Sequence, residues 1–190
     1  TGWGIAVYVL LRILLTAPAE DKRHARVTSV ALVMGWLGML AYLVWLVTGA
    51  ALALDCARAA GLWFFLLPIV LTVSHRMIPF FSSRVLDNYE MVRPFWMLWL
   101  MLACIAAHGL LQCFELTGYL WLADFPLAAC ALYLSYRWQL QRSFQVSLLA
   151  VLHISFAWFG VAMALYAVQS LVYFASGNFI LGLAPLHALG

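Results

Sequence analysis

Residues 143–190 read SFQVSLLAVLHISFAWFGVAMALYAVQSLVYFASGNFILGLAPLHALG and contain no Asp, Glu, Lys or Arg. The same character extends over the whole chain, in which 67% of the residues are hydrophobic and only 9% are charged. Soluble domains carry about 25% charged and about 45–50% apolar residues. The composition therefore argues against a soluble enzyme, a disordered chain or a disulfide scaffold, and it predicts an integral membrane protein.

Apolar segments long enough to cross a bilayer recur along the chain. A hydrocarbon core of about 30 Å requires about 20 apolar residues in a helix. Backbone polar groups in lipid must bond internally, and strand-like alternation is missing from the sequence, so we expect helices. We predict an all-α, polytopic transmembrane helix bundle that forms a single domain over 1–190, with roughly six spans and the start of a seventh. The predicted segments are 2–17, 27–53, 59–80, 95–115, 119–139, 145–171 and 178–190.

The sequence around two prolines and at the chain ends allows further predictions. Pro79 is expected near the end of the third segment. Asp124, which precedes Phe125 and Pro126, either caps a helix that begins at residue 125 or is a buried carboxylate, and the sequence favours the cap. Since the chain does not begin with Met and its last apolar segment is too short to cross a bilayer, we expect a fragment of a larger membrane protein.

Basic residues recur at every second connection and predict the orientation. They are Lys22, Arg23 and Arg26 in the connection 18–26, Arg84 and Arg93 in 82–94, and Arg137 and Arg142 in 137–142. The intervening connections contain only Arg58. We therefore expect the loops 18–26, 82–94 and 137–142 on the cytoplasmic side. The net charge is +3, but the basic residues form no continuous run. We therefore expect membrane lipid as a partner and no nucleic acid.

Three histidines lie in otherwise apolar segments, where ionisable side chains mark function by default. With this orientation and the 1.5 Å rise per helical residue, His108, His153 and His187 share a depth band of roughly 8 Å near the bilayer midplane. Three imidazoles at similar depth on three helices suit a haem or a copper site. For each histidine, a hydrogen bond to a neighbouring helix is the alternative.

Two further features extend the candidate site. His75 falls near the cytoplasmic end of its segment beside Arg76, where the pair could bind a metal or a haem propionate; a simple interfacial position is the alternative. A stripe at helical spacing could hold Cu(I), although core packing is its commoner role. The stripe consists of Met97, Met101, Cys104 and His108, followed by Gln112 and Glu115.

Three stretches of the chain resemble the C-terminal part of the NnrS family of polytopic bacterial membrane proteins. Residues 76–82, RMIPFFS, are similar to the family's Arg-hydrophobic-Ile-Pro-x-Phe-Thr motif. Residues 147–158, SLLAVLHISFAW, resemble its Leu-Leu-x-x-Leu-His segment before an aromatic residue, and residues 186–189, LHAL, resemble its Leu-His-Ala-Leu. The order and the spacing of the three stretches fit the family, whereas residues 1–60 match it only in hydropathy.

The resemblance implies a multi-pass protein of the bacterial cytoplasmic (inner) membrane that binds haem, expected to be of b type, with copper as a second candidate. It implies a contribution to nitric oxide metabolism or to tolerance of nitrosative stress. The implied partners are nitric oxide or a related small molecule, and the remainder of the same chain or other membrane helices. By motif, His153, His187 and Arg76 carry over as cofactor-binding residues, and the two histidines also as metal ligands. His108 and His75 are metal candidates on depth and chemistry alone.

Other functions would use the same histidines. A cytochrome b-like subunit would transfer electrons with quinol, and a transporter would pass protons through histidine and Glu115. Whether the protein turns over a substrate stays open, and no residue is assigned a catalytic role.

Overall fold

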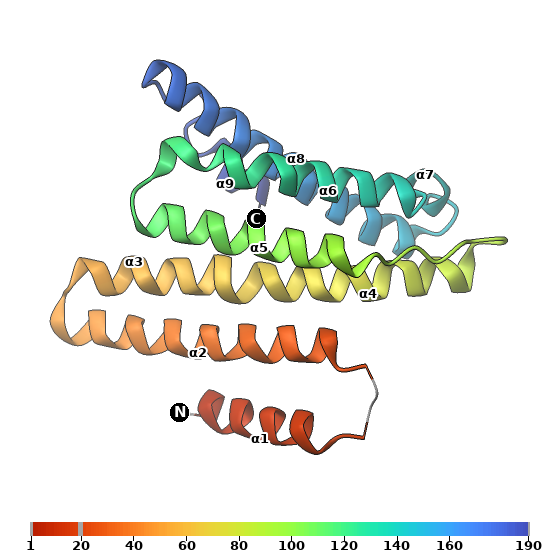
Figure 1. The fold of residues 1–190 in the computed structure, drawn as a ribbon, viewed down its shortest axis with the longest axis horizontal. Coiled ribbons are helices and arrows are strands. Elements are labelled where there is room, and N and C mark those ends of the chain that lie inside the picture. The colour runs from red at the N-terminus through yellow and green to blue at the C-terminus, as the bar shows by residue number, and fades with distance from the viewer. Residues whose placement is uncertain (1, 19–20, 190) are drawn as a thin grey trace. The chain divides into compact units, whose positions relative to one another are not determined.

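A computed structural model describes residues 2–18 and 21–189 of the chain. Within these residues the regular secondary structure is helical, without a strand, which confirms the predicted all-α class (Figure 1). The chain divides into two compact units, which we call unit 1 (Thr1–Val73) and unit 2 (Ser74–Gly190), and each is described by itself. The single domain over 1–190 stays a prediction. Residues 19 and 20 of the predicted connection 18–26, and Gly190 of the last predicted segment, lie outside the described residues.

Unit 1 contains α1 (Gly2–Thr16), α2 (Arg23–Thr48), α3 (Ala51–Ala59), the π-helical η1 (Ala60–Leu66) and the beginning of α4 (Leu67–Val85). The α2 helix ends at Gly49, whose positive φ of 69° lets its N–H bond to the Trp45 carbonyl. α2 packs closely on α3 and η1: a Cβ added at Gly38 would lie 2.9 Å from the Ala60 Cβ. Small residues thus let two apolar helices approach each other, as is common in membranes.

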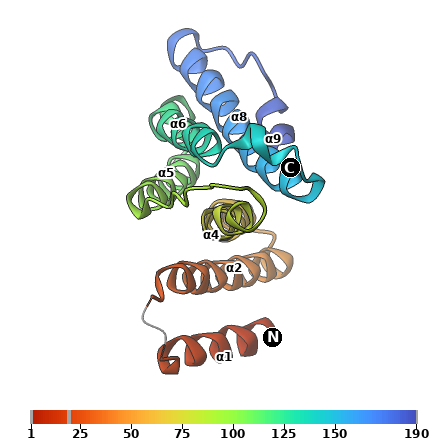
Figure 2. The same cartoon turned by 90° about the vertical axis from the view of Figure 1, so that its right-hand side faces the viewer.

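Unit 2 contains the rest of α4, α5 (Phe95–Cys113), the 3₁₀ turn η2 (Thr117–Tyr119), α6 (Trp121–Arg137), α7 (Leu140–Ser143), α8 (Ser147–Ser176) and α9 (Ala184–Leu189). α6 packs along α8 and also contacts α5. After Gly177, which ends α8 with a φ of 71°, the chain turns back and α9 packs beside α8 (Figure 2). α8 thus contacts α6, η2, α7 and α9 within this unit.

The predicted spans agree with the helices in part. Within the described residues, four helical stretches are long and apolar enough to cross a membrane: α2, the continuous Ala51–Val85, α5 and α8. The segments 2–17 and 119–139 also contain helices, but α1 has 15 residues and α6 has 17. The last predicted segment, 178–190, contains the six-residue helix α9 (Ala184–Leu189), and the start of a seventh span there stays a prediction. The molecule is a membrane protein with a polytopic, all-helical architecture.

The helix start expected at Asp124 was wrong, whereas Pro79 lies near the end of the third helical stretch, as expected. The third helical stretch continues through Pro79 to Val85, because a proline removes only one backbone hydrogen bond and packing can sustain the helix beyond it. α6 begins at Trp121 rather than 125. Its first N–H donates to the Ser170 Oγ at 3.1 Å, and this hydroxyl donates to the Thr117 carbonyl at 2.7 Å. A side chain of α8 therefore caps α6, and Asp124 is the buried carboxylate of the second interpretation.

Candidate functional site

His153 of α8 contacts Ser82, which lies in the last turn of α4. The Ser82 Oγ and the His153 Nε2 are 2.9 Å apart. The two residues are almost inaccessible, with 0% and 1% of their surface exposed. The other ring nitrogen of His153, Nδ1, is buried without a hydrogen-bond partner among the described residues. The result is an imidazole with one nitrogen held in place and the other able to bind a metal ion or a proton.

His108 of α5 pairs with Asp124 in the first turn of α6. The His108 Nδ1 and the Asp124 Oδ1 are 2.6 Å apart, and both side chains are 0% exposed. The Tyr166 ring stands edge-on to the imidazole, with ring centroids 5.2 Å apart. A carboxylate behind an imidazole is the arrangement that orients metal-bound histidines, and it also allows two groups to share a proton.

The pairing of His108 with Asp124 was not predicted from the sequence. The Asp-Phe-Pro pattern predicts a helix that begins at residue 125, which places the Asp124 carboxylate at the end of a helix and not beside the imidazole. The available signal was the rule that an acidic residue inside an apolar segment needs a partner. Applied to Asp124, this rule would have pointed to a buried histidine at a similar depth on a neighbouring helix.

His75 and Arg76 are neighbours in the sequence but differ in their surroundings. His75 is buried, and its ring lies 5.7 Å from the ring of Phe95 and 6.2 Å from that of Trp138, measured between centroids. Arg76 is exposed. The imidazole therefore lies among aromatic rings, while the guanidinium is accessible to an anionic group outside the helix.

His187 lies on α9, beside α8, and its side chain is exposed. The two hydrogen bonds above join His108 and His153 to Asp124 and Ser82, and neither bond joins two of the predicted histidines. In the part of the chain that the structure describes, no three His, Cys, Asp or Glu residues gather as metal ligands. A centre shared by several histidines stays a prediction.

The predicted stripe on α5 forms one buried face as far as His108. Met97, Met101, Cys104 and His108 are all buried. Gln112 is exposed, and Glu115 is exposed beyond the end of the helix, with a positive φ of 57°. Sulfur atoms and an imidazole therefore share a face inside unit 2, while the carboxylate of Glu115 is separate from it.

Comparisons with known proteins give one family. The family model described as NnrS protein matches residues 2–190. No curated protein and no solved structure matches the chain. The match includes residues 2–60, which the sequence motifs did not cover.

Proposed function

Because this chain belongs to the NnrS family, we propose that it is a haem-binding protein of the bacterial cytoplasmic membrane that acts on or responds to nitric oxide. It would contribute to nitric oxide metabolism or to tolerance of nitrosative stress. The observation that carries the proposal is the buried contact between Ser82 and His153. This contact joins residues 76–82 to residues 147–158, two of the stretches that resemble the family.

His153 would suit the role of a haem-iron ligand. Haem iron is commonly held by a neutral histidine nitrogen. The His153 ring is buried, Ser82 fixes one nitrogen, and Nδ1 has no partner among the described residues. Bound haem would supply an iron centre that takes a diatomic ligand such as nitric oxide, while this chain's residues orient the ring and exclude water from it.

The remaining site residues have supporting roles in this proposal. His187, on the helix packed against α8, is the second candidate ligand. Arg76 is exposed, so its charge is available to a haem propionate, and His75 is a further metal candidate. His108 is the candidate copper ligand, because Asp124 orients its ring and Met101 and Cys104 share its buried face.

The proposed membrane arrangement follows the distribution of charge. We place the protein in the inner membrane with several passes and with the loops 18–26, 82–94 and 137–142 on the cytoplasmic side. Its partners would be membrane lipid, nitric oxide or a related small molecule, and further membrane helices of the same or another chain.

A pyridine haemochrome spectrum combined with metal analysis of the purified protein tests this proposal. We expect haem in the native protein, a loss of most of it in His153→Ala, and full retention in His24→Ala, whose histidine lies outside the apolar core of α2. Ser82→Ala should retain haem but shift its absorption, because the ring loses its anchor. Native protein without haem, or a His153→Ala variant with unchanged haem content and spectrum, would contradict the proposal.

A further inference from the structure

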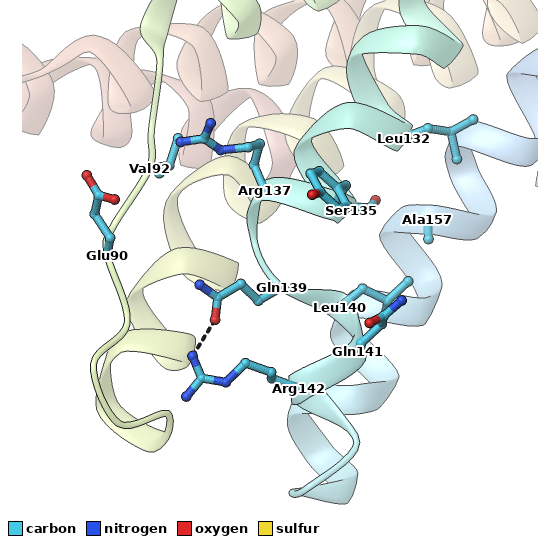
Figure 3. A pocket seen from close by; sticks show the side chains of 11 residues that line it. Glu90, Val92, Leu132, Ser135, Arg137, Gln139, Leu140, Gln141, Arg142 and Ala157 are labelled. Carbon is cyan, nitrogen blue, oxygen red and sulfur yellow. Dashed lines mark hydrogen bonds between the residues drawn. The ribbon is translucent and has the colours of Figure 1, made fainter.

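A pocket of about 590 Å³ opens beside the C-terminal end of α6, and two arginines of unit 2 line it. Its walls come from the loop that precedes α5, the C-terminal end of α6, α7 and one turn of α8 (Figure 3). None of the histidines of the candidate site lines it. The pocket is therefore separate from the residues proposed to hold haem.

Two arginines line the pocket without an acidic partner. Neither Arg137 nor Arg142 has a carboxylate oxygen within 4.0 Å in residues 2–18 and 21–189. Glu90 also lines the pocket, so the charges of its lining sum to one positive charge. A guanidinium presents several N–H donors in a fixed plane that matches phosphate oxygens.

The charged end of the pocket is held in position by neutral groups. Arg142 donates to the Gln139 Oε1 and to the Asp87 carbonyl, each at 2.6 Å (Figure 3 shows the first bond). The buried Trp138 donates from its Nε1 to the Val92 carbonyl at 2.8 Å. These bonds fix the loop before α5 against the α6–α7 turn, and they leave the charge of Arg142 uncompensated.

The opposite wall of the pocket is apolar. It includes Leu132 and Tyr136 of α6 and Ala157 of α8. Leu132 and Tyr136 are exposed, and so is Trp158, the neighbour of Ala157 on α8. The wall thus continues into the apolar outer face of the bundle. A ligand for this pocket should combine a negative headgroup with a hydrocarbon part.

We propose that this pocket binds the phosphate headgroup of an anionic glycerophospholipid, with the acyl chains against α6 and α8. Basic pockets between transmembrane helices on the cytoplasmic side recognise such headgroups. Arg137 and Arg142 would contact the phosphate, Gln139 would hold Arg142, and Leu132 and Tyr136 would contact the first methylene groups. The proposal is independent of haem binding, because the two sites share no residue.

Lipid binding measured by native mass spectrometry on the purified chain tests the proposal. The probes are phosphatidylglycerol and phosphatidylcholine with identical acyl chains. Since each arginine contributes about 1 kcal/mol to binding an anionic headgroup, we expect Arg137→Gln to weaken phosphatidylglycerol binding about fivefold. Arg137 is exposed, so its substitution should leave the fold intact. Arg26→Gln, at an exposed arginine outside the pocket, is the matched control with unchanged binding.

Three results would overturn the proposal. The first is equal affinity for phosphatidylglycerol and phosphatidylcholine. The second is an Arg137→Gln variant that binds phosphatidylglycerol as tightly as Arg26→Gln does. The third is complete displacement of the lipid by millimolar inorganic phosphate, which would assign the pocket to a soluble phosphate compound. Selective binding that phosphate leaves intact, and that Arg137→Gln weakens, supports it.

Discussion

Replacing Asp124 by leucine is expected to lower the free energy of unfolding by about 1–5 kcal/mol. The Asp124 carboxylate and the His108 imidazole are 2.6 Å apart and fully buried. Removing one partner of a buried charged pair costs about 3–5 kcal/mol, and about 1–3 kcal/mol if the pair is neutral, because the remaining polar group loses its partner. Asp124→Asn keeps an acceptor oxygen, so its cost should be smaller.

The double variant separates the pairing from other effects of the substitution. When both His108 and Asp124 become leucine, neither of their polar groups is left buried without the other. We expect His108→Leu/Asp124→Leu to be more stable than Asp124→Leu alone, with a coupling energy of about 2 kcal/mol. Glu115→Leu is the control, since an exposed acidic residue should change stability by less than about 0.5 kcal/mol.

Unfolding in mixed micelles by increasing fractions of SDS gives the required free energies, with helix content measured by circular dichroism. If the losses in unfolding free energy of the two single variants sum to the loss of the double variant within about 0.5 kcal/mol, the two residues do not interact, and the reasoning is refuted. The same outcome would remove the argument that Asp124 orients His108 for a metal ion.

Two further predictions test the helix contacts. Ser170→Ala should destabilise the protein by about 1 kcal/mol, because Ser170 caps α6, whereas Ser155→Ala should have little effect, since that hydroxyl bonds only within its own helix. Equal SDS midpoints for the two variants would contradict the cap. Gly38→Val should cost about 1–3 kcal/mol, because its Cβ would lie 2.9 Å from Ala60, while Gly61→Ala enters open space. Equal losses in thermal unfolding of these two variants would contradict the close α2–η1 packing.

The sequence pointed to the histidines of the candidate site but not to the residues that hydrogen-bond to them. His108 and His153 could be singled out because ionisable groups are rare in apolar segments. Their partners Asp124 and Ser82 lie 16 and 71 positions away. The hydrogen-bond partner of each ring depends on the rotation of two helices about their axes and on their register. Hydropathy contains little information about either.

The observed helix boundaries differ from the predicted ones for a similar reason. The start of α5 at Phe95 follows from local sequence, since Pro94 directly precedes it. The start of α6 depends on Ser170, a residue 49 positions later that supplies the cap from α8. Local rules at Asp124 placed the boundary four residues too late, because they compare only neighbouring residues.

The sequence by itself determined that this is a helical membrane protein of the NnrS family and which histidines lie in its apolar segments. Both properties depend on the length, order and composition of contiguous segments, because lipid requires each segment to satisfy its own backbone. Only the tertiary structure decided that Asp124 is buried against His108, that Ser82 holds His153, and that Arg137 and Arg142 line one pocket. These contacts depend on how helices pack, which is set jointly by side chains far apart in the chain.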